Sequence, residues 1–155
     1  MTDATFKLDD AQAQAMFKRL GNAGRNVTHM LDGVVYALTE RARLGFKDQQ
    51  DPWGGAWQPL AASTIKARRD NGRGGVSILR DTGALLNSLI GSASGNTGEI
   101  NIGFSDRPAT AHQFGTDRIP ARKMLPIRDG GQVDMPQIWR DEIIDVMTSH
   151  VEGAL

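Results

Sequence analysis

The strongest constraint on the fold is a run of apolar residues between positions 27 and 42 that repeats with the period of an α-helix. Its members are Val27, Met30, Leu31, Val34, Val35, Leu38 and Ala42. The opposite face is charged and carries Arg25, Asp32, Glu40, Arg41 and Arg43. Because such a helix must bury one face, other parts of the chain have to cover it. Gly45 stands where helices commonly end, which predicts a helix end there.

Further helices are expected on both sides of this segment. They span residues 9–20, 63–70, 81–88 and 135–151. Asp9 and Asp81 are expected to act as N-caps of the first and third of these helices. The last helix is amphipathic and has Pro136 in its first turn, where the missing N–H costs little. The chain is therefore expected to end on a helix that packs against the core.

A small antiparallel sheet is expected in the second half of the chain. Residues 98–104 alternate, with Ile100, Ile102 and Phe104 on one face. Residues 89–93 are the expected partner strand, and Asn96 with its flanking glycines makes the turn. Residues 5–8 predict a short strand or an extended lead-in.

Together, these expected helices and strands predict an α+β fold with N-terminal helices, a small antiparallel sheet and a C-terminal amphipathic helix. Pro120 and Pro126 predict an extended course for residues 119–127. Glycine-rich or aromatic stretches at 46–60 and 71–77 predict long flexible loops. A length of 155 residues favours one domain over residues 1–155.

Composition excludes several classes of protein. There is no cysteine, which excludes disulfides and thiolate metal sites. The chain has 18 basic and 18 acidic residues, whereas a general nucleic-acid binder usually has a basic excess. Apolar runs are too short to cross a bilayer, and Met1 to Asp10 lacks the order of a signal peptide. We expect no membrane contact and no export.

Catalytic and metal-binding motifs are weak. Asp81-Thr82-Gly83 matches the aspartic-peptidase triplet, but a following helical pattern favours an N-cap role for Asp81. Ser63-Thr64-Ile65-Lys66 matches the short Ser-x-x-Lys pattern without the companion motifs of serine acyl-enzymes. The histidines lack ligand spacing; they are His29, His112 and His150. We expect no catalytic residue, no cofactor and no metal ion.

Two clusters are candidates for partner contact. The basic cluster consists of Lys66, Arg68, Arg69 and Arg73. It predicts either a solvated face or a contact with nucleic acid or an acidic partner. The second cluster is Trp53 and Trp57 in a glycine-rich loop, where two indoles either fold back onto the core or anchor a partner.

Four segments stand in a defined order between residues 45 and 127. They are Gly45-Phe46 leading to Asp51-Pro52-Trp53-Gly54-Gly55-Ala56-Trp57-Gln58-Pro59-Leu60; Ser63-Thr64-Ile65-Lys66; Ile78-Leu79-Arg80-Asp81-Thr82-Gly83-Ala84-Leu85; and Ala111-His112-Gln113-Phe114-Gly115 before Ile119-Pro120-Ala121-Arg122-Lys123-Met124-Leu125. This order resembles the phage virion morphogenesis, or tail completion, family of contractile-tailed and Mu-like phages. Pro108-Ala109 departs from it, since the family usually has a Tyr-Ala pair there.

The resemblance implies a structural protein of the virion that is made in the cytoplasm of the bacterial host and has no catalysis. Similar proteins form rings, often hexameric, at the neck or tail. The implied partners are further copies of this chain, phage connector, tail terminator or tail tube proteins, and DNA passing the basic cluster. Arg122 and Lys123 lie in the extended segment expected to face a partner or the lumen, while His112 to Gly115 are expected to turn the chain with Phe114 packed inward.

Three functions stay open on the sequence alone. The first is a neck or tail assembly subunit that acts only by binding proteins. The second is a homodimeric aspartic-type peptidase that uses Asp81, which needs this residue at the end of a strand. The third is nucleic-acid contact through the basic cluster, which should weaken with salt.

Overall fold

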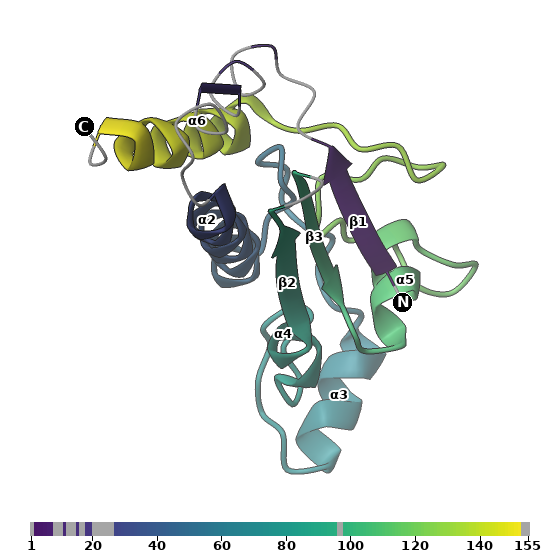
Figure 1. The fold of residues 1–155 in the computed structure, drawn as a ribbon. Coiled ribbons are helices and arrows are strands. Elements are labelled where there is room, and N and C mark those ends of the chain that lie inside the picture. The colour runs from purple at the N-terminus through teal and green to yellow at the C-terminus, as the bar shows by residue number, and fades with distance from the viewer. Residues whose placement is uncertain are drawn as a thin grey trace.

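A computed structural model describes residues 2–7, 11, 15, 18, 19, 27–95 and 98–152. Its elements are, in chain order, β1 (Thr2–Lys7), α2 (Val27–Asp48), α3 (Ala62–Asp70), α4 (Ala84–Asn87), β2 (Leu89–Ser94), β3 (Glu99–Phe104), α5 (Pro108–Phe114) and α6 (Gln137–Glu152) (Figure 1). The α+β class is therefore confirmed, with a C-terminal helix. The helix expected over 9–20 lies largely outside the described residues, although positions 11, 15, 18 and 19 are helical.

The sheet is antiparallel with the strand order β1-β3-β2. Leu89 pairs with Phe104 and Ser94 with Glu99, which confirms the hairpin expected from the alternating pattern. The first strand, β1, pairs along the other edge of β3, from Thr2 opposite Phe104 to Lys7 opposite Glu99. A strand near the N-terminus was predicted, but its pairing with β3 was not.

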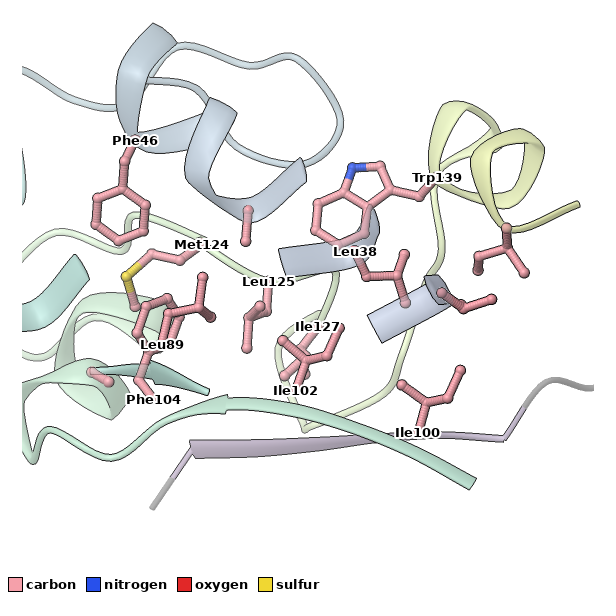
Figure 2. Close-up of a cluster of buried hydrophobic side chains, with 14 of the residues drawn as sticks. Leu38, Phe46, Leu89, Ile100, Ile102, Phe104, Met124, Leu125, Ile127 and Trp139 are labelled. Carbon is pink, nitrogen blue, oxygen red and sulfur yellow. The ribbon is translucent and has the colours of Figure 1, made fainter. Parts of the chain in front are cut away.

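The core lies between one face of the sheet and the two long helices (Figure 2). Alternate residues of β3 supply the floor, namely Ile100, Ile102 and Phe104. The apolar stripe of α2 covers them, as its period predicted. Gly91 in β2 allows this close approach, because an added Cβ atom would lie 2.6 Å from Cγ1 of Val35. The glycine therefore sets how near α2 can lie to the sheet.

The C-terminal helix α6 closes the other side of α2. It buries Trp139, Ile143 and Met147, so the amphipathic helix predicted for 135–151 is confirmed. Nε of Arg41 donates to Glu142 at 2.6 Å, which adds an ion pair between the two helices. In the described part of the chain, no helix has the length and apolar character needed to span a membrane.

The predicted end of α2 at Gly45 is wrong, because the helix runs on to Asp48. Phe46, one residue later, is buried and stacks edge-on against Trp57 with ring centroids 5.4 Å apart. Tertiary packing of Phe46 thus outweighs the local preference of glycine for a helix end. Gln49, with φ of 55°, carries the left-handed turn instead.

Candidate partner-binding groove

Segments that are distant in the sequence surround one groove with a volume of about 690 Å³. Its walls come from residues 58–64 with Arg68, from 79–85, from 106–112 and from 118–122. Each of the four sequence segments that carry the family resemblance contributes to these walls. The fold therefore brings the separate motifs together at one place on the surface.

Arg122 lies at the base of this groove and is only 6% exposed. Its Nε donates to the carbonyl oxygen of Gln58 at 2.9 Å, and Nη2 donates to that of Pro59 at 3.1 Å. Burial, and then the positive charge of Arg68, lower the pKa of Arg122 from its usual value. The side chain thus ties the segment after Trp57 to residues 119–127, which form no helix, as expected, but bend at 119, 125 and 126 and do not run extended throughout.

Arg68 is also buried, with 8% of its surface exposed. Its Nη1 donates to the carbonyl oxygens of Gly75 at 3.2 Å and Ser77 at 2.8 Å. The expectation of a solvated basic face is therefore wrong for Arg68. Hydrogen bonds from this guanidinium hold the glycine-rich stretch after α3 against the helix.

Asp81 pairs with arginines and does not cap α4. Its carboxylate lies 3.5 Å from Nε of Arg68 and 3.3 Å from Nη1 of Arg73. The N-cap of α4 is Gly83, with φ of 83°, which has no side chain that could accept a capping hydrogen bond. Thr82 Oγ1 instead accepts from the N–H of Ala84 at 3.3 Å. The predicted N-cap role of Asp81 is wrong because two arginines from α3 and the following loop take up its carboxylate.

His112 lines the groove from α5. Its Nδ1 is buried and has no hydrogen-bond partner among the described residues, while its carbonyl oxygen accepts from the N–H of Arg122 at 2.6 Å. Burial, and then the charge of Arg122, lower the pKa of His112, and Asp106 opposes this shift. The imidazole is therefore neutral at pH 7.

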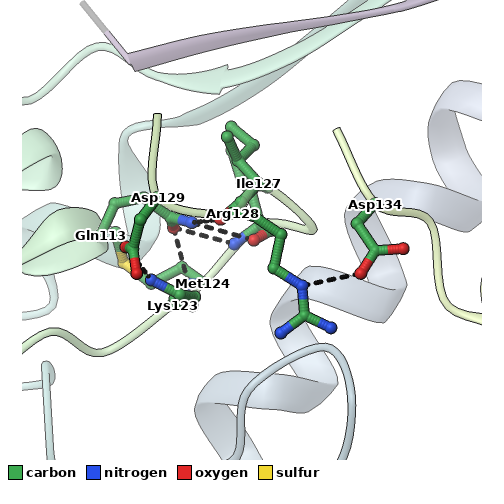
Figure 3. Close-up of polar contacts among 8 residues, drawn as sticks. Gln113, Lys123, Met124, Ile127, Arg128, Asp129 and Asp134 are labelled. Carbon is green, nitrogen blue, oxygen red and sulfur yellow. Dashed lines mark hydrogen bonds and ion pairs between the residues drawn. The ribbon is translucent and has the colours of Figure 1, made fainter. Parts of the chain in front are cut away.

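Gln113, the next residue, is fully buried, although no sequence pattern marks it as a structural residue. Its Oε1 accepts from the N–H groups of Met124 and Leu125, and its Nε2 donates to the carbonyls of Leu125 and Ile127 (Figure 3). The predicted turn at His112 to Gly115 is wrong, because α5 continues through Phe114. Phe114 is half-buried against the core.

The two tryptophans of the aromatic loop differ in role. Trp57 is 5% exposed, and its Nε1 donates to the carbonyl oxygen of Lys123 at 2.9 Å. It therefore belongs to the core. Trp53 is half-buried near the surface, with the guanidinium carbon of Arg128 3.7 Å from its ring centroid.

The expected long loop at 46–60 has internal structure. Its first residues belong to α2, and Asp51 Oδ1 then accepts from the N–H groups of Trp53 and Gly55. The N–H of Trp57 donates to the carbonyl oxygen of Gln49 at 2.9 Å. This turn holds Trp53 beside a second groove of about 590 Å³, where Leu44 and Ile138 are exposed.

The remaining candidate residues are exposed or half-buried at the surface of the molecule. Lys66 is exposed and pairs with Asp70 at 2.5 Å, and Lys123 pairs with Asp129 at 2.6 Å. Arg69 is exposed on α3. The basic cluster is thus divided between buried, paired and exposed side chains.

Comparison with known proteins decides the family. The model of the phage virion morphogenesis family matches residues 8–152. The chain belongs to the phage virion morphogenesis family. It is also 30% identical over 145 residues to Mu-like prophage FluMu G protein 1 of Haemophilus influenzae, covering 91% of this chain and 95% of that protein. No solved structure matches the chain.

Membership of the virion morphogenesis family gives the protein a role in building a phage particle. The matched range contains every segment that lines the 690 Å³ groove. The groove therefore lies wholly within the region that matches the family.

Proposed function

We propose that this protein is a structural virion subunit that completes the tail or joins head and tail at the neck. It does so by forming a ring of identical copies and by docking to neighbouring connector, tail terminator or tail tube proteins. The observation that carries this proposal is the match to the virion morphogenesis family over residues 8–152. The ring and the neck position go beyond that match, and the 690 Å³ groove supports the docking of a partner.

The polar side chains of the groove support a binding role. Arg68 and Arg122 are used to hold backbone carbonyls, and Asp81 is held by two arginines. These side chains stabilise the walls of the groove, and the groove presents a preformed surface to a partner. Apolar side chains that remain exposed at the second groove, namely Leu44 and Ile138, favour further protein contact.

The peptidase alternative fits the geometry poorly. An aspartic dyad shares one proton between two carboxylates. Asp81 instead contacts two guanidinium groups, and the helix α4 begins three residues later, at Ala84. A comparison of the wild type with Asp81→Asn in a peptide-cleavage assay tests this alternative, and we expect no cleavage by either protein.

Contact with DNA is also less favoured than protein docking. Arg68 is buried, Lys66 pairs with Asp70, and Arg73 pairs with Asp81, so little of the basic cluster is free to meet phosphates. Phosphate tracking usually requires several free cations on one surface. Salt-independent behaviour in a DNA-binding assay would agree with this conclusion.

Deletion of the gene in the phage or prophage that encodes it tests the proposed function. We expect electron micrographs to show heads and unfinished or unattached tails, and infectivity to return when the gene is supplied in trans. Normal joined particles from the deletion strain would contradict the proposal.

A further inference from the structure

The 690 Å³ groove has an excess of positive charge. Its lining includes Arg68, Arg118 and Arg122, against the carboxylates of Asp81 and Asp106. Asp81 is already shared between Arg68 and Arg73. With His112 neutral, the lining has a net charge of +1 (three arginines minus two aspartates). The groove is therefore suited to a partner that brings negative charge.

Arg122 is the centre of this excess. Among the described residues, no carboxylate lies within ion-pair distance of its guanidinium, which donates instead to the neutral carbonyls of Gln58 and Pro59. Its Nη1 forms no hydrogen bond within the described ranges. A buried charge without a counter-ion is costly, and the cost falls when a carboxylate enters. Arg118, exposed on the rim, is also without an ion pair in the described part of the chain.

A complementary surface lies on α6 of the same chain. Ile138, Asp141 and Asp145 are exposed at the spacing i, i+3, i+7, so they form one stripe along the helix. Ile138 is 53% exposed, which is a large apolar surface to leave in water. The stripe thus combines an apolar side chain with two carboxylates, and the groove combines arginines with apolar walls from Leu60, Ile119 and Pro120.

The two surfaces lie at opposite ends of the molecule. Figure 1 places α6 at one end and α3 and α4, which border the groove, at the other. They therefore cannot meet within one copy. A contact between two different surfaces of identical chains is heterologous, and such contacts close into rings when the rotation between copies allows it.

We propose that the groove receives the α6 stripe of a second copy, with Arg118 and Arg122 facing Asp141 and Asp145 of that copy. This inference rests on the proposed function, since it describes how neighbouring ring subunits would be joined. It assigns one half of the interface to the groove and the other half to the C-terminal helix, in a helix-in-groove arrangement.

Cysteine cross-linking tests the contact, because the chain has no cysteine of its own. Thr64 is exposed on the α3 wall of the groove, and Ser149 is exposed one turn beyond Asp145 on α6. The full-length double variant Thr64→Cys/Ser149→Cys, assembled into particles and treated with a short bismaleimide, should give a ladder of dimers and higher species. The matched control Thr64→Cys/Gln132→Cys places the second cysteine on an exposed loop and should give no ladder.

Charge-reversal variants give an independent test. Light scattering measures self-association of the purified chain, and the number of finished phage particles measures assembly. Arg118→Asp and Asp145→Arg are each expected to weaken self-association by about tenfold or more, because attraction becomes repulsion. The double variant should restore most of it. Both residues are exposed, so folding of each variant should match that of the wild type.

The outcomes separate the two proposals. If the wild-type chain forms rings but Thr64→Cys/Ser149→Cys cross-links no better than the control pair, and the double reversal gives no rescue, the groove-to-α6 contact is overturned and the ring stands. Cross-linking of Thr64→Cys to a different virion protein overturns the choice of a second copy. Absence of the chain from finished particles overturns the proposed function as well.

Discussion

The side-chain amide of Gln113 binds both backbone polar groups of Leu125. Its Oε1 accepts from the N–H of Leu125 at 3.1 Å, and its Nε2 donates to the carbonyl oxygen at 3.0 Å. It also binds the N–H of Met124 and the carbonyl oxygen of Ile127. One buried glutamine therefore satisfies backbone groups of residues 124–127 that no strand pairs with in the described part of the chain, and it fixes the position of the chain next to Arg122.

Gln113→Ala is expected to lower the free energy of unfolding by about 3 kcal/mol or more, because it leaves buried backbone groups without partners. Gln113→Glu should be at least as harmful, since a carboxylate cannot donate to the two carbonyls. Urea denaturation measures both effects. Gln132→Ala, at an exposed position, is the control. A loss within about 0.5 kcal/mol for Gln113→Ala would contradict the role described for this residue.

Two neighbouring arginines on α3 provide a matched pair. Arg68→Met removes hydrogen bonds to Gly75 and Ser77 and should lower the free energy of unfolding by about 2 kcal/mol. Arg69→Met, on the exposed side of the helix, should change it by less than about 0.5 kcal/mol. Thermal or urea unfolding compares them directly. Equal effects of the two substitutions would argue against a structural role for Arg68.

Gly91→Ala is expected to destabilise the fold by about 1–3 kcal/mol, because the new Cβ atom would overlap Val35 and crowd Thr39 of α2. The double variant Gly91→Ala/Val35→Ala should lose less stability than the sum of its single changes. Gly75→Ala serves as the control, since nothing lies within 4 Å of a Cβ atom there. Additive losses in the double variant would show that the helix does not press on β2 at this point.

The lowered pKa of His112 predicts a dependence of stability on pH. Well above the ordinary value of 6.5 the residue is neutral in both folded and unfolded chains, and it contributes no pH dependence there. As the pH falls below 6.5, the unfolded chain binds a proton before the folded chain does, so stability is lost. The difference in unfolding free energy between wild type and His112→Gln should therefore move in favour of the variant between pH about 7.5 and about 5. A difference that is constant with pH would contradict the burial of a neutral imidazole.

Local sequence patterns predicted the helices and strands that are determined by the residues within them. The apolar period of α2 and the alternation of β3 reappear directly in the buried residues of the core. Patterns failed where a distant side chain decides the structure. Phe46 carries α2 past Gly45 because it packs on Trp57, and Asp81 turns away from α4 because Arg68 lies beside it.

The candidate site shows the same contrast between what local sequence patterns predict and what contacts between distant residues determine. The order of the motif segments pointed to the family, but not to the groove that these segments build together. The sequence position of Arg122 does not indicate that its side chain binds the carbonyls of Gln58 and Pro59, because these residues are 64 and 63 positions away along the chain. Gln113 gave no signal of its own, because a glutamine between a histidine and a phenylalanine fits no structural motif, and its four hydrogen bonds to three residues are seen only in the fold.

The most direct test of a structural role is a cryo-electron microscopy reconstruction of finished particles from the phage or prophage that encodes this chain. We predict several copies in a closed ring at the neck or tail, each with its groove against α6 of the next copy. Finished, infectious particles that lack the chain would contradict it.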